Sequence, residues 1–205
     1  LIFDKEVINS DERRIGKTIN FGVIYGMGIK KFARSTGVSS LEAKEFLVKY
    51  KERYSKIFKF LELQERLALS KGYVKTIFGR KREFKFDKNG LGRFIGKDPY
   101  DIDLKSARRA GLEAQSLRAA ANAPIQGSSA DIIKIAMIKI QEQIKRNNFP
   151  IKLLIQVHDE LLFEVPDDNV DLARDFIKKT MEDSVKLDVP LIVDIGVGDN
   201  WMETK

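Results

Sequence analysis

The first 72 residues show apolar positions at helical spacing between polar ones. One helix is expected from about Asn9 to Tyr25, because small polar residues that cap free amides precede it and Gly26 follows it. A second helical stretch opens at residues 39–42, where Ser and Glu stand in a capping-box pattern, and its apolar face continues to Gly72. The pattern therefore predicts a helical N-terminal part.

The middle of the chain is less regular. Short alternating segments at 73–78 and 83–86 predict a small hairpin, and the stretch 87–106, rich in Gly, Lys and Asp, predicts a loop. Two helices are expected next, over 107–122 and 129–147, because Pro124 should end the first of them.

The last third combines strand and helix patterns. Apolar segments at 151–156 and 161–165 flank a short polar turn, which predicts a hairpin with polar residues at its tip. A helix is expected over 170–185 and a closing strand over 191–197. The second half of the chain is therefore expected to be α+β.

Composition narrows the function classes. The chain has 205 residues, 43% of them hydrophobic, which suits one large domain or two small ones. No apolar run approaches the roughly 20 residues that cross a bilayer, so we expect an intracellular protein without membrane contact. A net charge of +7 favours a polyanionic partner, and the absence of cysteine and the single histidine leave oxygen ligands for any metal. The opening LIFDKEV resembles the interior of an element, so we expect a fragment.

A basic and aromatic stripe is the first candidate site. Arg13, Lys17, Phe21 and Tyr25 are spaced by four, so on a helix they follow one slowly winding face. Two cations can meet the phosphates of a nucleoside triphosphate, and two aromatic rings can pack on its sugar and base. The spacing is also compatible with a half-buried helix that has a wet basic end and an aromatic core end.

The polar turn at residues 158–160 is the second candidate. Asp159 and Glu160 are adjacent carboxylates at an expected hairpin tip, and such a pair suits a hard cation such as Mg²⁺ held together with substrate phosphates. An ordinary polar turn would have the same composition. A phosphohydrolase of the His-Asp type would need further histidines, and His158 is the only one in the chain.

Three longer runs resemble family A DNA polymerases. The run RRIGKTINFGVIYGM from Arg13 to Met27 resembles motif B on the nucleotide-binding helix of that family, and QVHDE at 156–160 resembles motif C. RAAANAPIQGSSAD at 118–131 resembles the palm segment that precedes motif C. The resemblance covers almost the whole chain and is weakest over 87–112.

The resemblance implies roles for these residues. Arg13 and Lys17 would contact the triphosphate, Phe21 would stack near its sugar and base, and Tyr25 would gate the templating position. Asp159 would bind the catalytic metals beside Glu160, and these two with Lys17 are the expected catalytic residues. Arg118, Asn122, Gln126 and His158 would contact the DNA or the primer end; their donors can read minor-groove acceptors present at every base pair.

The implied fold is α+β, with a helical fingers portion over 1–72 and an antiparallel-sheet palm portion over 73–205. The implied partners are primer-template DNA and deoxynucleoside triphosphates, the implied cofactor is Mg²⁺, and the protein would be a monomer in the cytoplasm or an organelle. The family's motif A, which supplies the other metal-binding carboxylates, lies upstream of motif B, and only twelve residues precede Arg13. We therefore expect these 205 residues to be inactive alone.

Two other readings stay open. A nucleic-acid or nucleotide binding module without catalysis would share the stripe, although it would not need Asp159 and Glu160. A single-subunit RNA polymerase is a weaker alternative, because Phe21 stands where those related enzymes usually carry tyrosine.

Overall fold

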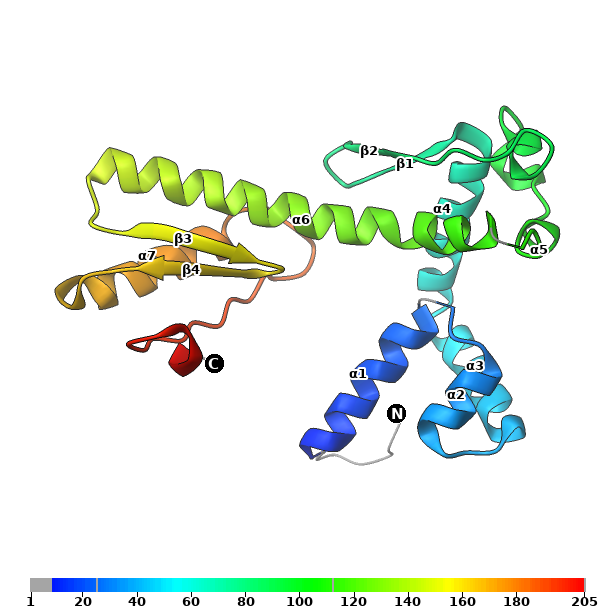
Figure 1. Cartoon of the computed structure of the whole chain (residues 1–205), viewed down its shortest axis with the longest axis horizontal. Helices are drawn as coiled ribbons and strands as arrows, with labels where there is room; N and C mark the ends of the chain where they lie inside the picture. Colours follow the sequence, from blue (N-terminus) through cyan, green and yellow to red (C-terminus); the bar gives the residue numbers. More distant parts are fainter. Residues whose placement is uncertain (1–8, 25, 112, 205) are drawn as a thin grey trace. The chain divides into compact units, whose positions relative to one another are not determined.

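A computed structural model describes residues 9–24, 26–111 and 113–204 (Figure 1). The chain divides into two compact units, Leu1–Pro124 and Ile125–Lys205, and each is described by itself. The architecture is α+β: helices dominate, and the described residues include two antiparallel two-stranded sheets. The division by compactness does not test the fingers and palm boundary expected between residues 72 and 73, which stays a prediction.

Four helices open the first unit: α1 Ser10–Ile24, α2 Ile29–Thr36, α3 Ser40–Arg53 and α4 Ser55–Lys71. The predicted capping box is confirmed, since the Ser39 hydroxyl accepts from the Glu42 amide and the Glu42 carboxylate accepts from the Ser39 amide. The sequence reasoning missed α2, which buries Phe32. Its core partners come from α1 and α3 and are Ile19, Val23, Ala43 and Leu47.

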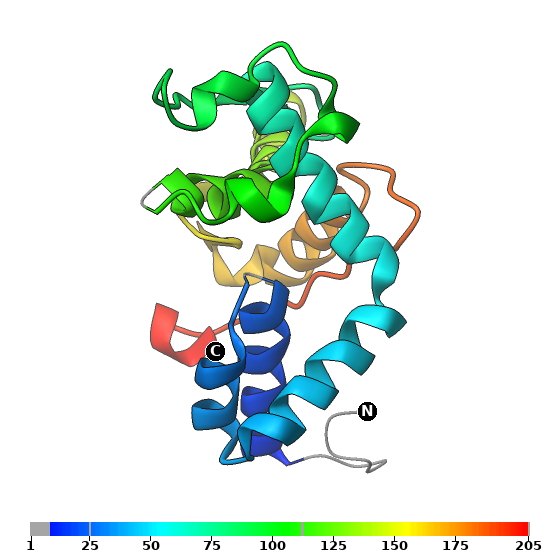
Figure 2. The same cartoon turned by 90° about the vertical axis from the view of Figure 1, so that its right-hand side faces the viewer.

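Beyond α4 the chain forms the predicted hairpin, β1 Tyr73–Lys75 and β2 Lys81–Glu83. The predicted loop at 87–106 is wrong, because this stretch contains η1 Leu91–Phe94, η2 Pro99–Asp101 and α5 Leu104–Ala107. Leu91, Phe94, Ile102 and Leu104 form a buried cluster with residues that include Leu69 of α4. Figure 2 shows α4 running from the helical group of α1 to α3 toward this part of the unit.

The long helix α6 spans Glu113–Asn147 without a break at Pro124. The two separate helices predicted here are therefore wrong. Proline removes one helical hydrogen bond, which favours a break in an isolated helix. Packing opposes that tendency: Ala120 and Ala123 are buried against Ala68 of α4 and Val74 of β1, so the helix continues through the proline.

The second unit contains β3 Lys152–Val157, β4 Glu160–Glu164, η3 Asp167–Asn169, α7 Val170–Glu182 and η4 Trp201–Thr204. Its core joins Ile140 and Ile144 of α6 to Ile151 and to Ala173 and Ile177 of α7. The closing strand predicted over 191–197 is wrong, since this stretch has no strand pairing and the Val193 amide donates to the Glu182 carboxylate at 3.0 Å. In the part of the chain that the structure describes, no helix is long and apolar enough to cross a membrane.

Candidate nucleotide and DNA site

Three members of the basic and aromatic stripe lie on an exposed face of α1. Arg13, Lys17 and Phe21 are all exposed, and the Phe21 side chain has a relative exposure of 58%. On the same helix, Ile19 and Val23 are buried at 2% and 3% exposure. The helix therefore buries Ile19 and Val23 and exposes two cations and a phenyl ring. Tyr25, the fourth predicted member, lies outside the described residues.

Tyr50 of α3 helps to fix the orientation of α1. Its hydroxyl donates to the side-chain oxygen, Oδ1, of Asn20 at 2.7 Å. Burial, aided by the nearby Tyr54, raises the pKa of Tyr50 above 10.0, so the phenol keeps the proton that it donates. This bond ties the exposed side of α1 to α3.

The end of α1 meets Arg118 of α6. Gly26 has φ +82°, a left-handed conformation that glycine adopts readily. A Cβ atom on Gly26 would lie 3.4 Å from Cδ of Arg118, so the aliphatic part of that side chain lies against the glycine. The structure thereby brings a predicted DNA-binding residue to the end of the predicted nucleotide-binding helix. No local pattern in the chain predicts this contact.

Asn122, one helical turn after Arg118, is buried at 7% exposure. Its side-chain amide donates to the Arg118 carbonyl at 2.9 Å, while its Oδ1 is buried without a hydrogen-bond partner among the described residues. A buried acceptor left unpaired costs about 1 to 3 kcal/mol, so such atoms are rare. Asn122 is therefore placed to support Arg118 through the backbone and offers one spare acceptor.

The tip of the β3–β4 hairpin carries the acidic site. Val157 pairs with Glu160, so His158 and Asp159 alone form the turn. His158 has φ +51°, and its carbonyl accepts from the Gln156 side-chain amide at 2.7 Å. Asp159 and Glu160 are exposed. The sequence reasoning included Gln156 in a motif but missed its role, which is to brace the turn that presents the carboxylates.

These predicted residues fall into separate groups. Arg13, Lys17, Phe21, Arg118 and Asn122 lie in the first unit, while Gln126, which is exposed on α6, and the hairpin tip lie in the second. No group of three or more His, Cys, Asp or Glu side chains that could hold a metal ion occurs among the residues described. The acidic tip therefore offers part of a metal shell, through Asp159 and Glu160.

Comparison with known proteins gives one consistent family. Residues 1–203 match the family described as DNA polymerase family A. DNA polymerase I of Synechocystis is 48% identical over 205 residues, covering 100% of this chain and 21% of that protein. The thermostable DNA polymerase I of Thermus filiformis is 38% identical over 202 residues, covering 98% of this chain and 22% of that protein. This chain thus spans about a fifth of the length of these relatives.

A solved structure agrees with the sequence relatives. The POL domain of Pol1 from M. smegmatis, in complex with DNA primer-template and dNTP, matches with a TM-score of 0.77 and 32% identity. The match covers 96% of this chain and 32% of that one.

Proposed function

Because this chain belongs to DNA polymerase family A, we propose that its residues serve template-directed DNA synthesis, with α1 binding the incoming deoxynucleoside triphosphate. The solved relative from M. smegmatis holds DNA primer-template and dNTP, and we extend those partners to this chain. The fingers portion would comprise residues 1–72 and the palm portion residues 73–205. The working protein would be a cytoplasmic or organellar monomer.

The observation that carries this proposal is the exposed face of α1. This face carries two exposed cations and an exposed phenyl ring, whereas Ile19 and Val23 of the same helix are buried. It suits a ligand with an anionic end and a flat end. Arg13 and Lys17 would bind the triphosphate, Phe21 would pack on the sugar and base, and Tyr25 would gate the templating position.

The DNA would be held by donors on α6 and at the hairpin tip. The aliphatic part of Arg118 lies close to Gly26, which places this residue near the end of the nucleotide helix. Arg118, Asn122 and Gln126 are spaced by four along α6. Arg118 and Gln126 are exposed and can donate to the minor-groove acceptors present at every base pair, while the buried Asn122 would support Arg118 through its carbonyl. His158 would contact the primer end. This set supports binding that is indifferent to sequence.

Asp159 and Glu160 would hold Mg²⁺. Both offer hard oxygen donors, both are exposed, and the braced turn gives them a fixed position, so the residues present fit one side of such a site. The chemistry that bound Mg²⁺ supplies in such a site is activation of the primer hydroxyl and stabilisation of the leaving pyrophosphate. Asp159 is the proposed direct ligand, and Glu160 would lie beside it. Lys17 would neutralise charge on the triphosphate.

The proposal can be tested in a polymerase of full family length that carries these 205 residues, called here the family-length enzyme. Arg13→Ala and Lys17→Ala should each raise the KM for deoxynucleoside triphosphates by about 5- to 150-fold, the equivalent of about 1 to 3 kcal/mol for a charge-assisted contact. The Kd for primer-template should change little. Lys31→Ala, which removes an exposed cation of α2, is the matched control. An unchanged KM with a collapsed DNA affinity would contradict the assignment.

A further inference from the structure

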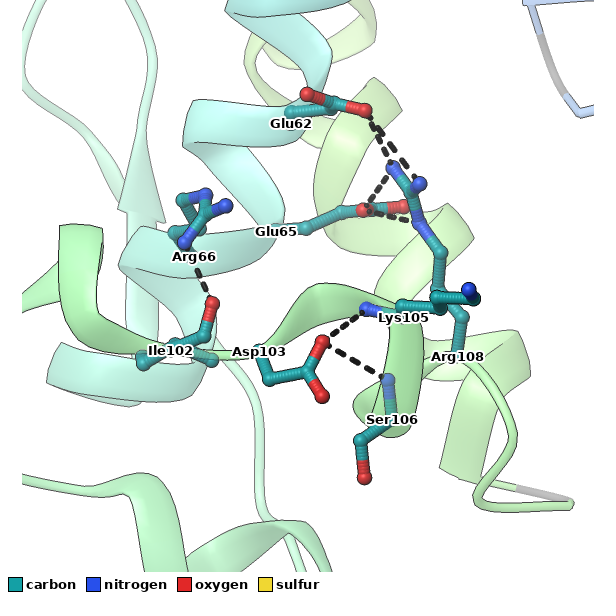
Figure 3. Close-up of polar contacts among 8 residues, drawn as sticks. All are labelled: Glu62, Glu65, Arg66, Ile102, Asp103, Lys105, Ser106 and Arg108. Atoms are coloured by element: carbon teal, nitrogen blue, oxygen red, sulfur yellow. Dashed lines mark hydrogen bonds and ion pairs between the residues drawn. The ribbon is translucent and has the colours of Figure 1, made fainter.

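The segment 87–111 is held to α4 through its backbone. The Arg66 guanidinium donates to three carbonyl oxygens, those of Pro99 at 3.1 Å, Tyr100 at 3.3 Å and Ile102 at 2.6 Å. Figure 3 shows the contact with Ile102. A guanidinium carries five N–H donors and no acceptor, so one arginine side chain can hold several carbonyl groups. The contacts hold the main chain at Pro99, Tyr100 and Ile102 and do not involve the Tyr100 side chain, which is exposed.

The same arrangement recurs along the segment. The Ser70 hydroxyl donates to the Lys97 carbonyl at 2.5 Å, and the Ser70 carbonyl accepts from the Gly96 amide at 2.8 Å. At the other end, the Glu113 carboxylate accepts from the amides of Asp87 at 2.8 Å and Leu91 at 3.0 Å. These hydrogen bonds hold the backbone of the segment through Ser70 and Glu113.

The acidic residues of the segment are largely occupied by capping. Asp98 accepts from the Tyr100 amide at 2.8 Å, and Asp103 accepts from the amides of Lys105 and Ser106 at 2.9 and 3.2 Å (Figure 3). Asp87 caps its own turn by accepting from the amides of Asn89 and Gly90. Each of these carboxylates therefore has at least one lone pair committed to a backbone amide.

The cations of the segment are exposed and available. Lys88, Arg93, Lys97, Lys105 and Arg109 are all exposed, and none forms an ion pair with any residue that the structure describes. Arg93 and Lys97 lie over the ring of Phe94, at 5.0 and 5.4 Å from its centroid. Because Phe94 is itself fixed in the core, these two charges sit on a rigid support.

Tyr100 adds an aromatic surface to these charges. Its side chain has a relative exposure of 76%, although its backbone is fixed by Arg66 and Asp98. An aromatic ring that is presented to solvent on an ordered backbone loses little freedom when a base stacks on it. Cations for phosphates together with a ring for bases are the combination that binds single-stranded nucleic acid.

We propose that the segment 87–111 is a second DNA-binding surface, on which Tyr100 stacks with an unpaired base and Arg93 and Lys97 bind the phosphates of single-stranded DNA. The identification of the bound polyanion as DNA rests on the proposed function. The surface is separate from the stripe on α1 and from the hairpin tip, and it falls where the resemblance to the family is weakest. It would hold unpaired template during synthesis.

The test is binding of the 205-residue chain to a fluorescent oligothymidylate of about 16 nucleotides and to a duplex of the same charge, followed by anisotropy. Tyr100→Ala should weaken single-strand binding by about tenfold and leave duplex binding unchanged, and Tyr100→Phe should keep both. Arg93→Gln with Lys97→Gln should lower the salt slope for the single strand by about 1.4. Lys44→Gln with Lys49→Gln on α3 makes the same charge change elsewhere and should not act.

The outcomes separate this inference from the proposed function. Equal losses for duplex and single strand in Tyr100→Ala would overturn the stacking role, and equal losses in the α3 control would overturn the phosphate role. If Arg118→Ala weakened primer-template binding while the segment variants changed nothing, the second surface would be refuted and the proposed function would stand. Loss of single-strand binding in the segment variants, with no dependence of synthesis on Arg13 or Asp159, would refute the proposed function alone.

Discussion

Arg108→Met should destabilise the first unit by about 2 kcal/mol at pH 7 and by less than about 0.5 kcal/mol at pH 4.5. The Arg108 guanidinium contacts Glu65 at 2.7 Å and Glu62 at 3.5 Å (Figure 3). The Glu65 side chain is only 7% exposed, whereas that of Arg108 is 46% exposed. Methionine keeps most of the aliphatic stem and removes the charge, so Glu65 is left buried without its cation.

The size of the effect depends on the cost of protonating Glu65 when its cation is missing. Burial raises the pKa of Glu65 above its ordinary 4.5, and Arg108 opposes part of that rise. Without Arg108 the carboxyl can take up a proton, and holding it neutral at pH 7 costs at most about 3.4 kcal/mol, from 2.5 pH units at about 1.36 kcal/mol each. Near pH 4.5 the proton is almost free of cost. Because Arg108 is half exposed, solvent screens its ion pair with Glu65, and the expected loss of stability is smaller than this upper limit.

The pH dependence has a definite sign. A carboxyl whose pKa is raised on folding binds its proton more tightly in the folded chain, so its favourable contribution is present below 4.5 and is lost as pH rises through the folded pKa. Without Arg108 the pKa of Glu65 in the folded chain rises further, so in the variant the loss of stability with rising pH continues to higher pH. Urea unfolding followed by tyrosine absorbance measures it, because all five tyrosines lie within residues 1–124.

Two controls make the result decisive. Arg109→Met removes the adjacent exposed charge, which has no ion pair in the described part of the chain, and should change stability little at either pH. Glu65→Gln combined with Arg108→Met removes both charges and should recover most of the loss. Destabilisation of equal size at pH 7 and pH 4.5, or in Arg109→Met, would refute the electrostatic reasoning.

Further predictions concern the stripe, the end of α1 and the DNA. Phe21→Tyr should relax discrimination against dideoxynucleotides in the family-length enzyme, because a tyrosine hydroxyl can replace the missing 3′-hydroxyl; an unmoved incorporation ratio would place the sugar elsewhere. Gly26→Ala should lower stability by about 1 kcal/mol in thermal unfolding, because its φ of +82° disfavours a Cβ atom and Arg118 lies close by. DNA binding should be indifferent to sequence and fall with salt, and a strong preference for one of two unrelated duplexes in a titration would oppose it.

Local patterns predicted the elements that carry the candidate site. The helix under Arg13, Lys17 and Phe21 follows from its caps and spacing, and the hairpin that presents Asp159 follows from two apolar runs around a polar turn. The stripe was ambiguous from spacing alone, since a half-buried helix has the same period. In the structure Ile19 and Val23 are buried and Phe21 is exposed, so Phe21 does not form an aromatic core end, and the role of the stripe stays a prediction.

Tertiary packing explains what the patterns missed. Pro124 should end a helix by local rules, yet α6 continues through it, and the buried Ala120 and Ala123 pack the turn before the proline. The stretch 87–106 was predicted as a loop because it is rich in Gly, Lys and Asp, whereas Leu91, Phe94, Ile102 and Leu104 within it are buried in the core. Asp103 and Asp98 act there as caps, a role that composition alone assigns equally well to turns.

Long-range contacts were beyond the sequence. The approach of Arg118 to Gly26 joins residues 92 positions apart, and no period or motif encodes it. The burial of Asn122 likewise depends on helices packed around it. The segment 191–197 has the apolar alternation of a strand but forms no ladder, because a strand exists only with a pairing neighbour.

Primer extension with the family-length enzyme tests the central claim most directly. Three proteins are compared: the 205-residue chain alone, the family-length enzyme, and the latter with Asp159→Asn. The chain alone should not extend a primer, because one hairpin tip cannot fix two ions about 3.5 to 4 Å apart. The family-length enzyme should extend it, and Asp159→Asn should abolish extension with primer-template Kd largely kept. Metal-dependent extension by the 205 residues alone, or wild-type rates in Asp159→Asn, would contradict the account.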